Sequence, residues 1–245
     1  MFTLYNAAQS TCSQKVRITL AEKEQGFSDI QLNLFTGDQF KPEYLKINPN
    51  GVVPTLMHDD SPIVDSSVII EYLDEIFPEN PLTPSSPLKR ARMRALMRFF
   101  EEVPTPAVRF PSYNNFFSRH FEKMSDEEFQ AFADAKPLRR NFFMKMGRTG
   151  FGEAEMNAAM HSLQLTVERM EKELEVGPWL LGEAFSLADI CVVPVLARLE
   201  DIGLDSLWQD SPLVAQWLGR FKERPSYRKA MYYGSMLSEK YGQAG

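Results

Sequence analysis

The sequence has 245 residues, of which 44% are hydrophobic and 24% are charged, a composition that excludes a disordered chain and provides a core without cross-links. Its net charge of −6 argues against non-specific binding to nucleic acid or to an anionic membrane. Two cysteines are too few for a disulfide framework and favour a reducing compartment. Because neither a leader sequence nor a membrane-spanning run is evident, we expect a cytoplasmic protein without nucleic-acid or membrane partners.

Strand and helix patterns alternate over residues 1–80. Alternating and β-rich runs predict strands at 2–5, 30–34, 52–57 and 63–64, and amphipathic patterns predict helices at 10–24, 40–47 and 66–76. The order β-α-β-α-β-β-α indicates a mixed sheet flanked by helices, with a hairpin at its end. We therefore expect one α/β domain over residues 1–80.

A linker rich in proline and hydroxyl residues is expected over residues 77–87. After it, helical patterns occur at 88–103, 126–135, 153–176, 187–202 and 214–223. We expect an all-helical domain over residues 88–245, so the chain combines an α+β domain with an all-α one. The segment 104–152 has no clear assignment, although its prolines are expected to kink or end a helix.

The segment Ser10-Thr-Cys-Ser13 lies between the first predicted strand and the first predicted helix. The start of a helix offers unpaired N–H groups and partial positive charge, which favour an anion. Hydroxyls and a thiol at this point fit either the stabilisation of a bound thiolate or the activation of Cys12 itself. The alternative is structural, because serine and threonine are common helix caps and a lone cysteine is usually a core residue.

Two further features of this domain fit a peptide ligand. A cis bond before Pro54 would turn the N–H and C=O of Val53 away from the sheet and toward an extended peptide, whereas the alternative is a simple edge-strand proline. Ser66 can offer a hydroxyl and amides to a carboxylate, and Asp65 can pair with an ammonium group. The alternative for this second pair is a helix cap.

In this order and spacing, the features resemble the glutathione S-transferase superfamily over nearly the whole chain. The resemblance rests on the segments Ser10-Thr-Cys-Ser-Gln-Lys-Val-Arg17, Tyr44-Leu-Lys-Ile-Asn-Pro49, Val52-Val-Pro-Thr-Leu56, Asp65-Ser66 with Glu71-Tyr-Leu73, and Phe185-Ser-Leu-Ala-Asp189. It implies a thioredoxin-like N-terminal domain, a helical C-terminal domain, glutathione as co-substrate, no metal, and a homodimer. The last segment is a capping box that the resemblance marks as structural.

The resemblance also implies how glutathione is held. The backbone of Val53, beside a cis Pro54, would pair with the cysteinyl part of glutathione. Ser66 would hold the γ-glutamyl carboxylate, with Asp65 near its ammonium group. Lys41 would meet the glycyl carboxylate, although a solvated surface lysine is an equal alternative.

The sulfur of glutathione is expected at the start of the first helix, beside Thr11 and three candidate catalytic residues. Ser10 occupies the position of the hydroxyl in plant-type and maleylacetoacetate-isomerase-type members, and Ser13 aligns with a serine of the bacterial β-etherases. Cys12 occupies the position of the reactive cysteine in tetrachlorohydroquinone dehalogenase. A serine would stabilise the thiolate by a hydrogen bond, whereas a cysteine would form a mixed disulfide. The choice among them stays open at the level of the sequence.

Segments of the second domain resemble the bacterial β-aryl-etherases, while Arg198-Leu-Glu-Asp-Ile-Gly203 and Trp208 are more similar to the dehalogenase. The resemblance implies that the glutathione thiolate attacks an electrophilic carbon of a small aromatic substrate, as in β-aryl ether cleavage. Reductive dehalogenation or thiol reduction through Cys12, isomerisation, and a non-catalytic interaction module are the alternatives.

An aromatic stretch with one arginine is the candidate substrate pocket. Its members are Phe100, Arg109, Phe110 and Tyr113. The rings would stack on an aromatic substrate, and Arg109 would hold a phenolate or carboxylate. The alternative is that most of these rings pack the helical core. The three histidines show no metal-ligand spacing, and Cys191 is expected in the core.

Overall fold

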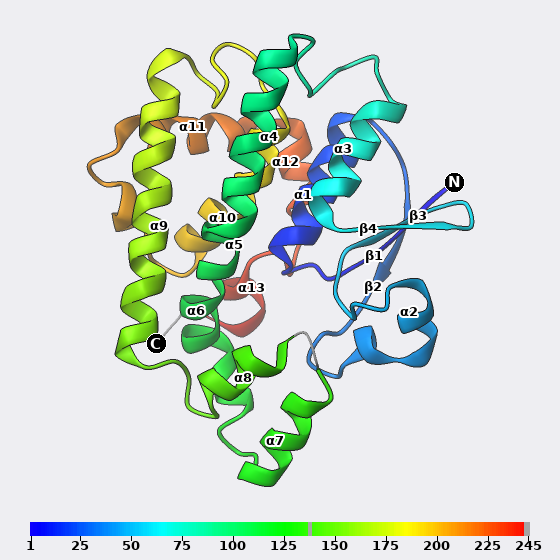
Figure 1. Ribbon diagram of the computed structural model, residues 1–245, viewed down its shortest axis with the longest axis vertical. Coiled ribbons are helices and arrows are strands. Elements are labelled where there is room, and N and C mark those ends of the chain that lie inside the picture. Colours follow the sequence, from blue (N-terminus) through cyan, green and yellow to red (C-terminus); the bar gives the residue numbers. More distant parts are fainter. Residues whose placement is uncertain (137–138, 243–245) are drawn as a thin grey trace.

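The computed structural model describes residues 1–136 and 139–242 (Figure 1). Its four-stranded sheet consists of β1 (Phe2–Asn6), β2 (Ser28–Gln31), β3 (Thr55–His58) and β4 (Ser61–Val64), in the order β2-β1-β3-β4. β1 pairs with β2 in parallel, whereas β3 is antiparallel to both β1 and β4. The helices of this part are α1 (Thr11–Glu22), α2 (Pro42–Ile47) and α3 (Ser66–Ile76). The predicted β-α-β-α-β-β-α order is therefore confirmed.

β2 departs from the prediction, because the alternating run at 30–34 mostly lies outside the strand. The Leu32 N–H still donates to the carbonyl of Asn6 at 2.8 Å, so pairing with β1 continues one residue beyond Gln31. The Asn33 side chain then accepts hydrogen bonds from the N–H groups of Phe35 and Thr36, at 3.1 and 3.4 Å. This local side-chain bonding starts a turn and ends the strand.

The rest of the described chain is helical. Its α-helices are α4 (Pro87–Glu102), α5 (Pro104–Ala107), α6 (Arg109–Ser112), α7 (Asp126–Asp134), α8 (Arg140–Met146), α9 (Glu153–Glu173), α10 (Leu187–Asp201), α11 (Pro212–Glu223), α12 (Pro225–Ala230) and α13 (Leu237–Tyr241). The five long predicted helices are all present. Proline at the start of α5 separates it from α4, as expected, and a π-helical turn at Tyr113–Phe117 follows α6. The short helices α12 and α13 lie outside the predicted elements.

α10 runs through the middle of the helical part and is buried on all sides. Its start is the predicted capping box of Ser186 and Asp189. The buried Asp189 carboxylate also accepts hydrogen bonds from the Leu180 N–H at 3.0 Å and from the Trp217 indole at 2.8 Å. These hydrogen bonds tie the start of α10 to the neighbouring chain, a structural role.

α1 is anchored to the helical part by buried charges, and this anchoring orients its first turn. Lys15, whose side chain is fully buried, pairs with Glu101 of α4 at 2.5 Å. Arg17 donates to the carbonyl of Ala230 at 3.0 Å and to the hydroxyl of Ser235 at 3.1 Å. The N-terminus of α1 therefore has a fixed position relative to α4 and to the C-terminal segment.

Candidate active site

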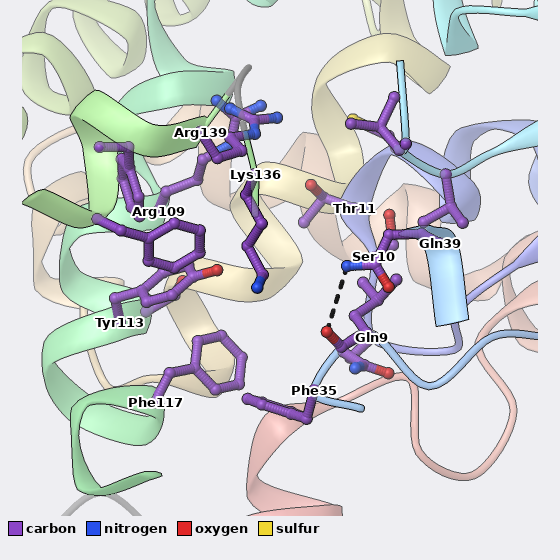
Figure 2. A pocket seen from close by; sticks show the side chains of 18 of the residues that line it. Gln9, Ser10, Thr11, Phe35, Gln39, Arg109, Tyr113, Phe117, Lys136 and Arg139 are labelled. Carbon is purple, nitrogen blue, oxygen red and sulfur yellow. Dashed lines mark hydrogen bonds between the residues drawn. The ribbon is translucent and has the colours of Figure 1, made fainter. Parts of the chain in front are cut away.

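A cleft lies where the start of α1 faces α6, α8 and the side chains of Lys136 and Arg139 (Figure 2). The wall from the sheet-containing part includes Gln9, Ser10, Thr11, Cys12, Phe35, Gln39 and Val53. The opposite wall includes Arg109, Tyr113, Phe117, Lys136, Arg139 and Phe142. A ligand in this cleft therefore touches the helix start and an aromatic, basic surface at the same time.

Ser10 is the N-cap of α1, and its hydroxyl oxygen accepts a hydrogen bond from the Ser13 N–H at 3.2 Å. The hydroxyl proton of Ser10 is not used by this bond, so it remains available to a ligand in the cleft. Thr11 and the free thiol of Cys12 line the same end of the cleft and are partly exposed. The positive end of α1 thus carries two hydroxyls and a thiol, the arrangement that favours a bound thiolate.

Ser13 differs from the other catalytic candidates in its placement. Its side chain is fully buried and does not line the cleft. Its hydroxyl oxygen instead accepts the Ala7 N–H at 3.5 Å. Three residues after the cap, the helix turns this side chain inward, where it supports the loop before α1. A catalytic role for Ser13 stays a prediction.

The peptide bond between Val53 and Pro54 is cis, as predicted. Val53 lines the cleft, and Pro54 is buried beside it. Among the described residues, the N–H and C=O of Val53 have no hydrogen-bond partner. These two groups are free to pair with an extended peptide.

Asp65 and Ser66 begin α3 but do not line the cleft itself. One carboxylate oxygen of Asp65 accepts the N–H groups of Ser67 and Val68, at 2.9 and 3.3 Å. Desolvation alone would raise the pKa of Asp65, but hydrogen bonds from Ser67 and Val68 lower it below its ordinary value. Asp65 is therefore ionised, as contact with an ammonium group requires, although the helix cap is its observed role.

Lys41 lies on the surface and pairs with Asp38 at 2.8 Å, which matches the surface alternative. Gln39, which the sequence reasoning missed, lines the cleft instead. Its side-chain amide donates to the carbonyl of Leu34 at 3.3 Å. Within the described ranges, its side-chain oxygen is buried without a hydrogen-bond partner. An N–H group of a ligand would satisfy this oxygen.

Two of the four predicted substrate-pocket residues line the cleft, namely Arg109 and Tyr113. Phe100 does not, because its ring is completely buried in the core. Phe110 does not either, because it packs against Phe151 with ring centroids 4.3 Å apart. The core alternative is correct for Phe100, whereas Phe110 is partly buried against the core.

Basic residues that the sequence reasoning missed complete the helical wall. Lys136 donates to the carbonyl of Phe132 at 2.8 Å, and burial lowers the pKa of Lys136 to about 8. Burial also lowers the pKa of Arg139, and the charge of Arg109 lowers it further. Burial raises the pKa of Tyr113, although both arginines oppose that rise. Figure 2 shows Lys136 extending between the aromatic wall and the start of α1.

The second cysteine, Cys191, lies away from the cleft. Cys191 is fully buried in α10 with its sulfur 3.4 Å from a carboxylate oxygen of Glu101, and burial raises the pKa of its thiol. It is a core residue, as predicted.

In the part of the chain that the structure describes, no cluster of histidine, cysteine, aspartate and glutamate side chains fits a metal ion. Over the same residues, no helix combines the length and the apolarity needed to cross a bilayer.

Both parts of the chain match known protein families. Residues 4–81 match the model of the glutathione S-transferase N-terminal domain, and residues 137–225 match that of the glutathione S-transferase C-terminal domain. The protein LigF of Sphingobium is 31% identical over 92% of this chain and 91% of its own. The crystal structure of β-etherase LigF superposes with a TM-score of 0.85 and 29% identity, covering 94% of this chain and 98% of the other.

Two plant relatives cover different shares of the chain. Arabidopsis glutathione S-transferase TCHQD is 26% identical over 93% of this chain and 88% of its own. Arabidopsis glutathione S-transferase Z1 is 49% identical, but over 36% of this chain and 40% of its own. With both family models matched and a thioredoxin-like N-terminal domain followed by a helical one, the chain belongs to the glutathione S-transferase family.

Proposed function

We propose that the protein uses glutathione as co-substrate and that the glutathione thiolate attacks an electrophilic carbon of an aromatic substrate. The observation that carries this proposal is the position of Ser10. It caps the N-terminus of α1 inside a cleft whose opposite wall is aromatic and basic. The glutathione sulfur would thus meet a helix start suited to a thiolate, and the aromatic substrate would meet a wall suited to a ring.

Glutathione would lie along the sheet-side wall in this proposal. The free N–H and C=O of Val53 would pair with its cysteinyl residue, and the buried oxygen of Gln39 would accept one of its N–H groups. The Ser10 hydroxyl and the first amides of α1 would then stabilise the sulfur as a thiolate, because both interact more strongly with the ionised form. Binding the two reactants in one cleft would accelerate the reaction further, because it orients the thiolate toward the electrophilic carbon.

Cleavage of a β-aryl ether is the specific form that we propose. The thiolate forms a C–S bond to the carbon that carries the aryloxy group, and the C–O bond breaks. The electron pair leaves with the phenolate, which takes up a proton, so the products are a glutathione thioether and a phenol. Similarity to LigF over 92% of the chain, in a protein whose crystal structure is described as a β-etherase, supports this choice.

A β-aryl ether whose leaving phenol is fluorescent tests the proposal directly. We expect the purified protein to release the phenol in the presence of glutathione and to form an equal amount of thioether, measured by mass spectrometry. Phenol release without glutathione would contradict the proposal. Failure of glutathione at millimolar concentration to produce heat in calorimetry, together with no turnover, would favour a non-catalytic interaction module.

We also propose a homodimer formed through α3 and α4, the elements that the family resemblance implies. Val68 of α3 and Leu88 of α4 are 53% and 81% exposed, so both apolar side chains are available to a second copy of the chain. Light scattering should therefore give twice the chain mass for the wild type, and Leu88→Glu should shift it toward the monomer. The matched control is Leu165→Glu on α9, where the exposed leucine lies outside the proposed interface. A monomeric wild type would contradict the proposal.

A further inference from the structure

The helical wall of the cleft is basic, although the chain as a whole has a net charge of −6. Four cationic side chains line the cleft, namely Arg109, Lys136, Arg139 and Arg198. Among the lining residues that the structure describes, none is an aspartate or a glutamate. A cleft with charge of one sign concentrates ligands of the opposite charge.

The two arginines nearest the aromatic wall have no countercharge. For Arg109 and Arg139, the described residues provide neither a salt bridge nor a side-chain hydrogen bond. Arg198 differs, because it donates to the carbonyl of Gln9 and lies 3.9 Å from the carboxylate of Asp201. Two neighbouring like charges without a partner cost free energy, and a bound anion recovers that cost.

Lys136 adds a third charge at the centre of the cleft. Its ammonium group lies 3.3 Å above the Phe132 ring and donates to the Phe132 carbonyl at 2.8 Å. An ammonium group has three N–H donors, so further donors remain for a ligand. No carboxylate of the described residues lies within ion-pair distance of it. Figure 2 shows this side chain between Tyr113 and Ser10, where a bound substrate would pass.

Aromatic rings surround these charges. Tyr113 lies 4.9 Å from both Phe117 and Phe142 between ring centroids, and Phe117 and Phe142 also line the cleft. Such walls accept a planar ring by edge-to-face or stacked contact. An aromatic ring that carries a negative group would pack against the apolar walls and pair with the cations at the same time.

We infer that Arg109, Arg139 and Lys136 form a subsite for an anionic substituent, a carboxylate above all, on the aromatic substrate. This inference rests on the proposed function and narrows its substrate class to aromatic acids. The subsite belongs to the second substrate and not to glutathione, because the groups proposed to hold glutathione, Val53 and Gln39, come from the opposite wall.

Two product-like ligands that differ in one carboxylate test the inference. Calorimetry would compare S-benzylglutathione with S-(carboxybenzyl)glutathione, the carboxylate being placed in the meta or para position. We expect the better carboxylated isomer to bind the wild type about 10-fold more tightly, the value of one charged hydrogen bond. Arg139→Gln and Arg109→Gln should each reduce this preference to about 3-fold or less while leaving the affinity for S-benzylglutathione unchanged.

Arg140→Gln is the matched control, because Arg140 is next in sequence but pairs with Asp134 on the surface at 2.6 Å. It should retain the full preference, and thermal unfolding should confirm that all three variants are folded. Equal affinities of the wild type for the neutral and both carboxylated ligands would overturn the inference and leave the proposed function intact. Loss of glutathione itself in the arginine variants would also overturn it. Failure of every ligand to bind the wild type would contradict the proposed function.

Discussion

Replacing Ser10 by alanine is expected to lower kcat for glutathione-dependent turnover by about 100-fold, the usual cost of removing one hydrogen-bond donor to a developing or bound anion. The Ser10 hydroxyl lines the cleft, and its proton is not used by the cap bond from the Ser13 N–H. Without this donor, the pKa of the bound glutathione thiol should rise. Ultraviolet absorbance of the thiolate across a pH series measures that rise independently of turnover.

The loss of a helix cap must be separated from the loss of a catalytic donor. Ser125→Ala is the matched control, since Ser125 caps α7 on the surface and accepts the Glu128 N–H at 3.1 Å. Both variants should lose about 1 kcal/mol of unfolding free energy. Only Ser10→Ala should lose activity and raise the thiol pKa.

Cys12→Ala distinguishes the thiolate mechanism from the disulfide mechanism. Cys12 is partly exposed in the cleft, so its thiol can reach a bound disulfide or substrate. If Ser10 stabilises the thiolate, Cys12→Ala should keep most of the wild-type turnover. Alkylation of the Cys12 thiol should then inhibit only because the added group occupies space in the cleft. Loss of turnover in Cys12→Ala with retention in Ser10→Ala would identify Cys12 as the nucleophile and favour the reductase or dehalogenase alternative.

Asp189→Ala should produce the largest loss of stability, about 4 kcal/mol of unfolding free energy. The carboxylate accepts bonds from the N–H groups of Leu180 and Ser186 and from the Trp217 indole, all of them buried. Removing it leaves these donors unpaired in the middle of the helical part. For a chain of this size, the midpoint of thermal unfolding should fall by about 10 °C.

Asp189→Asn provides the comparison, because its amide oxygen preserves one acceptor and the shape of the side chain. We expect a smaller loss for it, measured by denaturant unfolding under the same conditions. Equal losses for Asn and Ala would mean that the negative charge, and not the number of acceptors, carries the stabilisation. A loss below about 1 kcal/mol in Asp189→Ala, as for a surface cap, would contradict the role assigned to this carboxylate.

The sequence was informative wherever the signal is local. The position of Ser10 at a helix start follows from its neighbours alone, and the structure places it as the N-cap of α1. The capping box of α10 follows in the same way from Ser186 and Asp189. The cis bond before Pro54 is what the family resemblance of the segment Val52–Leu56 implies, and it is present. Each of these features depends on residues within a few positions of one another.

The features that the sequence did not reveal depend on distant packing. Gln39 lies in the short 3-10 turn Asp38–Phe40, and only the fold brings its buried oxygen to the cleft. Arg139 follows a stretch without periodicity, so nothing local indicated that it faces Arg109. For Phe100 and Phe110 the sequence is ambiguous in principle, because rings that fill a core and rings that line a pocket have the same composition. The domain limits 1–80 and 88–245 and the cytoplasmic location stay predictions.

The ion pair between Lys15 and Glu101 has a mechanical consequence. α1 begins beside the cleft and, one turn later, carries the fully buried Lys15, which pairs with the partly exposed Glu101 of α4 at 2.5 Å. Opening the molecule like a book would expose or separate these charges, and doing so costs several kcal/mol. Under the proposed function, the two walls that would bind the reactants are therefore held at a fixed spacing, and the width and charge of the cleft would determine which substrates enter it.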